Sequence, residues 1–549
     1  MHRLAPRPLF VFALFLSAGM AQLGVAQLPP VPAPPENPTT PEKAVLGKIL
    51  FWDEQLSSDN STACGTCHIP SVGGGDPRVD SALNVHPGPD QVFGTADDIR
   101  GSRGVVRSDP QGSYIDDGSF FPNPQVTGRK APPSIGAQWA PELFWDGRAG
   151  GAFEDPDTSV VIIPAGAALE SQAVGPMVSD VEMACEMRSH ADVAAKIANA
   201  IPLRLASNYP PDVAAALASS PTYPALFAAA FGDPTVTAAR MGMAIAAYER
   251  TLIPDQTPFD AFTQGTTTAL TPQQQLGLTV FNTTGACVLC HSGPNFSDET
   301  FSNIGVSPVA TDSGRFAVTS NPADLGKFKV PSLRNAGLRQ RFFHDGSKGN
   351  IANVINFYKL GGDHHVNQDI RIQPLTITHT EETALADFII NGLTDPRVAQ
   401  ELPPFDRPTL YSEIAFNAIL GAGESGSGGH VLSTFAPQPP LIGAPTFSFG
   451  VAKGVGGAPA MAAISLATAP PGTILSGHPV YVDLGSALFV PMTFGGPVGV
   501  PGKGSFSFRW AIPDDPNLFE ASVAVQFVAV DAAGNGSLVV SDAVVLTLF

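Results

Sequence analysis

Apolar residues recur at helical spacing in several parts of the chain. Residues 41–51 place apolar side chains three and four positions apart, which predicts a helix leading into the segment that follows. Residues 191–253 show mainly the same spacing, most clearly over 236–251. A further helix is expected to begin at Thr271 and Pro272, because Thr favours the N-cap and Pro the first helical position. The first 420 residues are therefore predicted to be mainly α-helical.

The pattern changes to short strand-like runs near the C-terminus. These runs lie at residues 444–451, 478–492, 504–510 and 523–530, with two further short strands expected within 538–549. Short strands at regular intervals predict an all-β sandwich module over residues 433–549. The Gly- and Ser-rich residues 421–432 are predicted to be a flexible linker. The module has no cluster of titratable groups, so we expect no chemistry in it.

The chain begins with basic residues, a short apolar run at 9–16 and then small residues. This order is typical of a secretory signal peptide over residues 1–26, cleaved after Ala21 or Ala26. A membrane anchor is the alternative, but the run is short for a span and polar or small residues interrupt it. Residues 27–41 are a Pro-rich leader, and no later stretch is apolar enough to cross a membrane. We expect a soluble, periplasmic or secreted mature chain.

Composition narrows the class of protein. With 549 residues, the length favours three or four domains, and 55 Gly and 53 Pro indicate many turns. The formal net charge of −19 argues against nucleic acid as a partner, because binding its phosphates needs Lys and Arg.

Four of the five cysteines form two motifs of one kind, Cys64-Gly-Thr-Cys67-His68 and Cys287-Val-Leu-Cys290-His291. This spacing attaches a c-type haem: the two thiols bond to the porphyrin and the adjacent His becomes an axial ligand of the iron. Two covalently bound haem c groups are therefore predicted.

Two other interpretations of these motifs are weaker. A zinc site needs a second Cys/His pair nearby, and a redox CxxC needs no following His. The fifth cysteine, Cys185, has no partner left, and we interpret it as a buried free thiol.

The residues around both motifs resemble those of the bacterial di-haem cytochrome c peroxidases and their methylamine-utilisation (MauG-type) relatives. The likeness runs from about residue 42 to 400, and the segments that carry it are 46–51 (LGKILF), 143–149 (LFWDGRA), 276–296, 328–335 and 343–346 (FHDG). The resemblance implies two cytochrome c-like helical lobes packed face to face, with one haem in each. We place them at residues 42–265 and 266–420.

Peroxide chemistry needs an open iron and an acid/base group above it. The resemblance implies that a Gln, a Pro four residues later and a Glu ten residues later line the distal side of the peroxidatic haem. Here these positions are Gln172, Pro176 and Glu182. Glu182 would carry the proton and Gln172 would hydrogen-bond the peroxide. The alternative is that Glu182 is a solvated acid at a helix start.

Two further features follow from the resemblance. Trp145 of the FWDGRA segment would lie between the haems and shorten the electron path, with core packing as the alternative. Residues 150–169 exceed the length found in relatives, and we expect them to form a loop that narrows or gates access to the first haem.

The sixth ligand of the second haem separates the subtypes. Family members place Met or Tyr fourteen residues after the His of FHDG, and counting from His344 gives Tyr358. Met raises the haem potential, whereas an anionic tyrosinate favours Fe(III) and higher oxidation states. Tyr358 therefore points to a MauG-like haem. The alternative is a tyrosine packed on a helix face.

Two metal-related features are weaker. His86 lies near the position of a histidine that blocks the first iron in some relatives, but the surrounding loop does not match, and a surface-loop histidine is the favoured interpretation. Relatives also hold calcium between the lobes. Here Lys130 replaces the Asn ligand and the carbonyl ligands would fall at Arg339 and Arg341, which argues against calcium.

The main functional hypothesis is a di-haem c-type peroxidase. It would reduce H₂O₂ at the N-terminal haem with electrons that enter through the second haem from a protein or small organic donor, such as a small cytochrome c or a cupredoxin. One alternative is a MauG-type oxidase of a protein side chain, using a high-valent state shared by both haems. Another is a pure electron-transfer cytochrome. A third possibility is that the β module tethers the protein to a surface or docks a partner.

Overall fold

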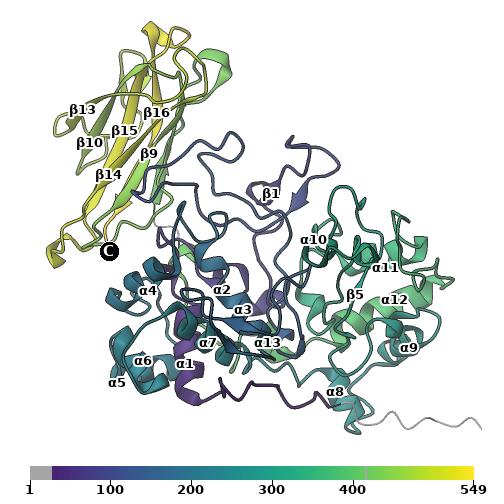
Figure 1. Ribbon diagram of the computed structural model, residues 1–549. Coiled ribbons are helices and arrows are strands. Elements are labelled where there is room, and N and C mark those ends of the chain that lie inside the picture. The colour runs from purple at the N-terminus through teal and green to yellow at the C-terminus, as the bar shows by residue number, and fades with distance from the viewer. Residues whose placement is uncertain (1–26, 415–416) are drawn as a thin grey trace, which may run out of the picture.

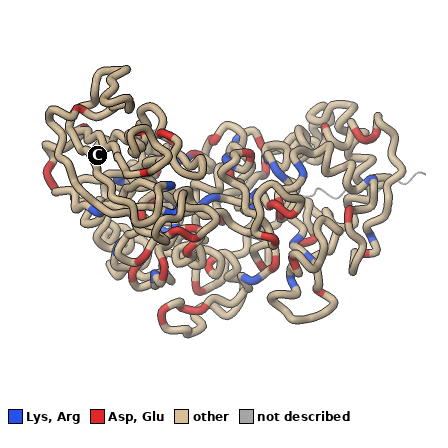
Figure 2. The backbone as a smooth tube through the Cα atoms, turned by 90° about the horizontal axis from the view of Figure 1, so that it is seen from above, with Lys and Arg blue, Asp and Glu red and all other residues tan. Residues whose placement is uncertain are grey.

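The computed structural model describes residues 27–414 and 417–549. The predicted signal peptide lies outside the described residues. Figure 1 shows a helical lobe in purple and teal, a second in green, and a yellow β module above the first. Figure 2 shows acidic and basic residues interspersed over the chain. The Pro-rich leader lies along the first lobe, where the Pro29 carbonyl accepts a hydrogen bond from the Trp139 indole at 3.1 Å.

The first lobe is built on two long helices, α1 (Pro41–Phe51) and α7 (Ala238–Glu249). Thr40 caps α1 by accepting a hydrogen bond from the Lys43 amide, and Pro41 occupies the first helical turn. The two helices pack closely, since a Cβ at Gly47 would lie 1.9 Å from the Ala244 carbonyl oxygen. The side chains buried between them include Leu46, Ile49, Leu50, Met241 and Ile245.

Shorter helices complete this lobe, as the pattern over 191–253 predicts. They are α3 (Ala168–Ala173), α4 (His190–Asn199), α5 (Pro211–Ser219) and α6 (Tyr223–Phe231). In the part of the chain that the structure describes, no single helix is long and apolar enough to span a membrane. The pair α5 and α6 meets the criteria of length and composition together, but it is bent by 100°.

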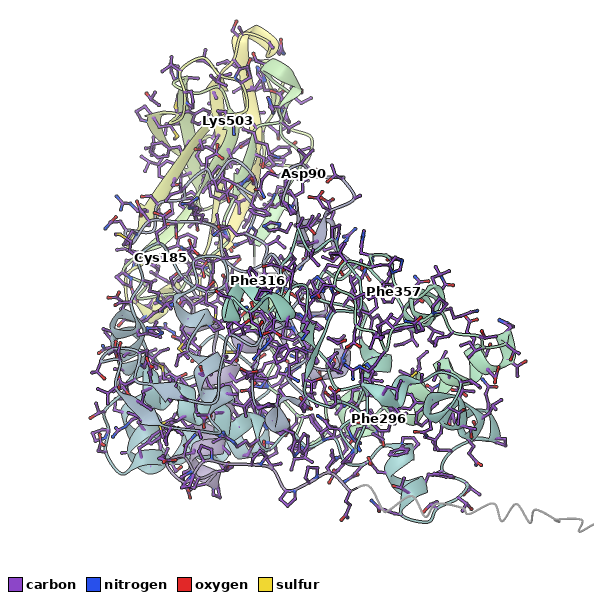
Figure 3. The ribbon with its side chains drawn as sticks, turned by 45° about the vertical axis from the view of Figure 1, so that its right-hand side comes forward. Asp90, Cys185, Phe296, Phe316, Phe357 and Lys503 are labelled. Carbon is purple, nitrogen blue, oxygen red and sulfur yellow. The ribbon has the colours of Figure 1, made fainter. Side chains whose placement is uncertain are left out.

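The second lobe repeats the central packing of the first. Helix α9 (Pro272–Asn282) begins at the predicted residues, where Thr271 and Gln274 form a capping box. It packs on α12 (His379–Asp387), and a Cβ at Gly277 would lie 2.1 Å from the Ala384 carbonyl oxygen. The remaining helices are α8 (Pro258–Thr263), α10 (Phe316–Thr319), α11 (Ile351–Leu360) and α13 (Pro396–Ala399). Figure 3 shows Phe296 and Phe357 in this lobe, away from the β module.

The segment from residue 69 to 130 is largely irregular, as its Gly, Asp and Pro content indicates. Its strands β1 (Val85–His86) and β2 (Ile99–Arg100) have two residues each. The segment also packs against the β module, which the sequence does not reveal. The Tyr114 hydroxyl donates to the Ser448 carbonyl at 3.1 Å, and the Tyr114 ring meets Phe435 edge to face at 5.1 Å. The module therefore supports the loop that follows the first haem motif.

Residues 150–169 form a hairpin rather than the expected plain loop. Strand β3 (Phe153–Glu154) pairs with β4 (Val161–Ile163), and Phe153 and Ile163 are buried against Ala239 of α7. This packing explains how the added residues are accommodated.

The C-terminal module consists of two sheets that share one core. The strands are β7 (Asn417–Leu420), β8 (Ser433–Phe435), β9 (Phe447–Gly454), β10 (Pro459–Ser465), β13 (Leu488–Thr493), β14 (Gly504–Trp510), β15 (Ser522–Val530) and β16 (Leu538–Thr547). The larger sheet has the order β13-β10-β15-β16-β7 and the smaller β14-β9-β8. Phe449 and Phe508 of the small sheet pack with Val525 and Phe527 of the large one. Strands β11 (Ile474–Leu475) and β12 (His478–Pro479) pair to form a short two-stranded ribbon.

Three details of this module differ from the sequence-based expectation. Residues 538–547 form one continuous strand instead of two, and β10 was not expected because its Ala and Met residues lack strong strand preference. Strand β7 already pairs with β16, so the Gly/Ser segment 421–432 crosses the edge of the module instead of preceding it. Within that segment Glu424 accepts a hydrogen bond from the Val540 amide at 3.1 Å.

Candidate active site: two cavities at the CxxCH motifs

The first motif lines a cavity of about 590 Å³, here called the first cavity. Cys64–Cys67 form the short helix α2, which begins where the Thr66 hydroxyl accepts a hydrogen bond from the Ala63 amide at 2.9 Å. Gly65 lies against Trp52, where a Cβ would come within 2.2 Å of the indole ring. The turn between the two thiols is therefore fixed by packing.

The second motif lines a smaller cavity of about 160 Å³, here called the second cavity. Cys287–Leu289 form a single 3₁₀ turn after α9. Tyr358 on α11 reaches the same cavity, and burial raises the pKa of its hydroxyl. Most of the remaining wall is apolar, with Ile304, Val306, Leu333, Ile351 and Ile355 among its residues.

The two motif histidines are held in the same way. The Nδ1 atom of His68 lies 3.0 Å from the Gly74 carbonyl oxygen, and that of His291 lies 3.0 Å from the Phe296 carbonyl oxygen. A carbonyl only accepts, so each Nδ1 carries the proton and each Nε2 is left as an unprotonated ligand atom. Burial also lowers the pKa of both imidazoles. With two thiols beside each imidazole, both sites fit the attachment and axial ligation of a haem c.

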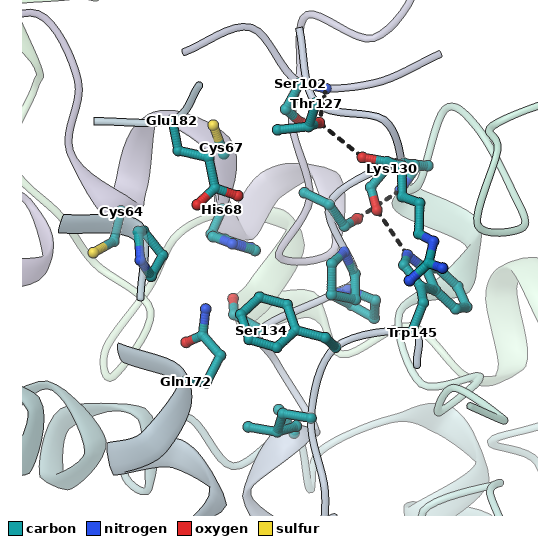
Figure 4. Close-up of a pocket in the computed structure, with 18 of the residues that line it drawn as sticks. Cys64, Cys67, His68, Ser102, Thr127, Lys130, Ser134, Trp145, Gln172 and Glu182 are labelled. Carbon is teal, nitrogen blue, oxygen red and sulfur yellow. Dashed lines mark hydrogen bonds between the residues drawn. The ribbon is translucent and has the colours of Figure 1, made fainter. Parts of the chain in front are cut away.

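The three residues that the family resemblance implies for the distal side all line the first cavity: Gln172, Pro176 and Glu182. Gln172 lies in the last turn of α3, and Pro176 begins the 3₁₀ turn Pro176–Val178. Figure 4 shows the Glu182 carboxylate and the Gln172 amide directed into the space that His68 enters. Burial raises the pKa of Glu182, opposed by the positive charge of Arg148 and a hydrogen bond from Ser179. A carboxyl of this kind retains its proton at higher pH than a solvated one.

Trp145 lines both cavities. Its indole N–H donates to the Lys130 carbonyl at 2.7 Å, a bond drawn in Figure 4, and its ring lies 6.4 Å from that of His344. His344 in turn stacks on Phe328 at 3.6 Å. Trp145 is therefore an aromatic group in the wall between the two sites.

Two residues of the first cavity were missed in the sequence. Arg148 stacks over Phe144 with its guanidinium carbon 3.5 Å from the ring centre. Glu249 of α7 is 5% exposed, and its Oε2 has no hydrogen-bond partner among the described residues. Burial raises its pKa to about 8. Arg148 belongs to the FWDGRA segment, whereas Glu249 was detectable only as the one carboxylate of the largely apolar helix α7.

The weaker candidates have other surroundings. His86 is absent from the lining of the first cavity, and its Nδ1 accepts a hydrogen bond from the Gly88 amide at 3.1 Å. The hairpin at 150–169 contributes no lining residue to either cavity within the described chain. Arg341 pairs with Asp80 at 2.5 Å. No group of three or more His, Cys, Asp or Glu in the described ranges is arranged to hold a metal ion.

Comparison with known proteins shows which chains this one resembles. The family model described as di-haem cytochrome c peroxidase matches residues 41–268. The MauG protein of Methylophilus methylotrophus is 30% identical over 363 residues, covering 65% of this chain and 84% of that protein. Cytochrome-c peroxidase IdrP1 of Denitromonas iodatirespirans is 28% identical, covering 68% and 87%. A crystal structure of a MauG-like protein associated with microbial copper homeostasis has 24% identity and a TM-score of 0.49, covering 69% of this chain and 96% of that one.

Proposed function

The chain belongs to the di-haem cytochrome c peroxidase family, and from that premise we propose that it reduces H₂O₂ at the first cavity. Electrons would come from a protein or small organic donor and enter through the second cavity. The observation that carries this proposal is the meeting of Glu182, Gln172 and His68 in one cavity of about 590 Å³. Two haem c groups attached at the CxxCH motifs would supply the iron that binds peroxide and the redox centres through which the donor's electrons reach it.

Glu182 is the proposed acid/base group. Its raised pKa lets the carboxyl hold a proton at higher pH than a solvated acid does, and that proton can be transferred between the two oxygen atoms of peroxide. Arg148 opposes this rise, so the Glu182 carboxylate remains accessible after the proton has left. Burial and Arg148 together give the Glu182 carboxyl a proton affinity above that of a solvated acid and below that of a buried acid without a nearby cation.

Gln172 and Pro176 are proposed to position the substrate. The Gln172 amide has no hydrogen-bond partner within the described residues in the structure, so its N–H groups are free to donate to peroxide. Pro176 adds an apolar surface that offers no competing hydrogen bond. Together they would orient peroxide toward Glu182.

Trp145 is proposed to carry electrons between the sites, because it lines both cavities. Lys130 fixes the indole through its carbonyl, which limits rotation of the ring. Aromatic side chains in the path shorten the distance that an electron must cross in one step.

The residues of the second cavity bear on which kind of di-haem enzyme this is. We propose that Tyr358 is an axial ligand there, since its hydroxyl enters the cavity that His291 lines. A tyrosinate ligand favours the MauG-type alternative, oxidation of a protein side chain, over a peroxidase that takes electrons from a cytochrome. Steady-state assays with H₂O₂ and a reduced small cytochrome c distinguish the two. Rapid turnover establishes the peroxidase, and slow turnover with oxidation of a protein substrate establishes the MauG-type activity.

The proposal extends to the domains and the location of the whole chain. We propose haem domains at residues 42–265 and 266–420, preceded by a signal peptide and a leader, and a periplasmic or secreted location. The β module, given as 433–549 from the sequence and extended to Asn417 by the strand pairing, is proposed to have no catalytic role. We propose no calcium between the lobes, because Lys130 and Arg339 place positive charge there.

A further inference from the structure

Lys130 is a buried cation without a buried anion to match it. Its side chain lines the first cavity and the residue is 4% exposed. The ammonium donates to a single oxygen, the neighbouring Ala131 carbonyl at 3.2 Å. No carboxylate among the described residues lies within 4 Å of it. Burying a charge without a partner costs several kcal/mol.

Arg339, which lines the second cavity, likewise has no carboxylate partner among the described residues. Two of its nitrogens donate to the Ser332 and Arg334 carbonyls at 3.0 and 2.9 Å. Its Nε is buried with no hydrogen-bond partner in the described chain, and no carboxylate there pairs with the side chain. Burial lowers the pKa of this guanidinium to about 10.

The two cations are close enough to repel one another. Burial and the positive charge of Arg339 lower the pKa of Lys130 to about 8, against the attraction of Asp76. The Asp76 carboxylate is already paired with Arg78 at 2.8 Å. The side chains also flank the same backbone, since an ideal Cβ at Gly73 would lie 3.1 Å from the Arg339 Cγ and one at Gly75 would lie 3.7 Å from the Lys130 Nζ. This backbone includes Gly74, whose carbonyl holds His68.

Two other cations outside the cavities, Arg334 and Lys196, have hydrogen-bond partners that satisfy them. Arg334, five residues before Arg339, forms two hydrogen bonds of 2.8 Å to the Asp260 carboxylate. Lys196 lacks a carboxylate but donates to the Ser57 carbonyl at 2.5 Å and to the Asn60 side chain at 2.6 Å. Neither of these residues lines a haem cavity. Lys130 and Arg339, which lack a carboxylate partner within the described chain, each line a cavity that a cofactor would fill.

Haem supplies the missing negative charge, because each porphyrin carries two propionate groups. We propose that Lys130 is a counter-charge for a propionate of the haem in the first cavity and Arg339 for a propionate of the haem in the second. The propionates would neutralise the two cations, and the cations would in turn help to hold the haem groups in the cavities. The inference rests on haem in both cavities and not on peroxide being the substrate.

This pairing has a measurable electrical consequence. A positive charge near a haem stabilises the ferrous form relative to the ferric form, so removing it lowers the reduction potential. We expect Lys130→Gln to shift the reduction equilibrium of the first haem at least tenfold toward the ferric state, which is 59 mV for one electron. Arg339→Gln should do the same to the second haem. The charge-conserving variants Lys130→Arg and Arg339→Lys should stay within threefold of the wild type.

The experiment is a spectroelectrochemical titration of the purified protein with both haems attached. Lys196→Gln is the matched control, because it removes a half-buried lysine of the same lobe that lines neither cavity. Larger shifts for Lys130→Gln and Arg339→Gln than for the control, each at its own haem, would support the proposal. Shifts within twofold, or equal to those of the control, would overturn it.

A second measurement applies even where a charge-removing variant does not fold. Resonance Raman bands of propionate bending are compared between the wild type and Lys130→Arg. A moved band supports contact between this side chain and the propionate, whereas an unchanged band contradicts it. Neither readout requires peroxide turnover, so failure of the peroxidase proposal and failure of this one are distinguishable.

Discussion

The first and second cavities are alike in their motif residues and differ in the residues that line the rest of each cavity. In each, two thiols and an imidazole lie on one wall, and each imidazole donates from Nδ1 to a backbone carbonyl at 3.0 Å. The other residues that line the two cavities differ in chemistry and in the space they enclose. The first has an acid, an amide and about 590 Å³ of space, while the second has a tyrosine, apolar side chains and about 160 Å³.

This contrast shows that the CxxCH motif sets attachment and leaves reactivity to other elements. Gln172 comes from α3 and Glu182 from the segment between α3 and α4, whereas Tyr358 comes from α11, in the other lobe. The α1/α7 and α9/α12 pairs repeat one packing scheme around their glycines. Two equivalent scaffolds thus support two different sites.

The largest expected effect is on proton transfer in the first cavity. Glu182→Gln keeps the shape of the side chain but removes the acid/base group, so peroxide turnover should fall about 10²–10⁴-fold. The measurement is steady-state H₂O₂ reduction with a fixed electron donor. Glu154→Gln, exposed on the β3–β4 hairpin, is the control and should keep full activity. Retained activity in Glu182→Gln would remove the functional distinction of the first cavity.

The wall shared by the cavities is tested with Trp145→Phe. This change keeps an aromatic ring but loses the hydrogen bond to Lys130, worth about 1 kcal/mol, so electron transfer between the haems should slow by up to about tenfold. Stopped-flow reduction of the first haem through the second measures this rate. Trp139→Phe also loses an indole hydrogen bond but lines neither cavity, and it should leave the rate unchanged. Equal rates in both variants would exclude Trp145 from the path.

The amide of the first cavity is expected to matter less than the acid. Gln172→Ala removes about one hydrogen bond to peroxide, which should raise KM for H₂O₂ about fivefold with a smaller change in kcat. Gln373→Ala removes an amide from the second cavity and serves as the control. A rise in KM from Gln373→Ala instead would place the peroxide in the second cavity.

Opening the second cavity should make the two sites more alike. Tyr358→Phe removes the hydroxyl that is proposed to close the second iron, so the number of cyanide molecules bound per chain should rise about twofold, from one to two. Tyr481→Phe in the β module is the control and should still bind one cyanide molecule per chain. If Tyr358→Phe also binds one, this tyrosine does not close the second site.

A small effect on stability is expected from Glu249. Burial raises its pKa to about 8, above the value of about 4.3 in an unfolded chain. Between these values the folded protein holds a proton that the unfolded chain has lost, so the free energy of unfolding decreases as pH rises through this window. Glu249→Gln should therefore gain about 2–4 °C in Tm relative to the wild type between pH 5 and pH 8. A constant Tm difference across that range would contradict the assignment.

Local patterns in the sequence predicted both haem attachment sites, the helix over residues 41–51 and the capped helix that begins at Thr271 and Pro272. The set Gln172, Pro176 and Glu182 was implied by the resemblance to the family. The sequence did not predict that Tyr114 packs against the β module, or that Arg148 and Glu249 join the first cavity. Those contacts join segments far apart in the chain, and no local pattern encodes them. Gly/Ser content also misled at residues 421–432, since flexible composition does not prevent strand pairing at its ends.

The inequality of the two cavities is tested most directly by an EPR spectrum of the resting ferric protein. We predict one high-spin signal, from a haem at His68 whose iron would keep an open position, and one low-spin signal, from a haem whose iron would be bound by both His291 and Tyr358. Cyanide should convert the high-spin signal and leave the other unchanged. Two low-spin signals that cyanide does not alter would contradict the account and indicate an electron-transfer cytochrome.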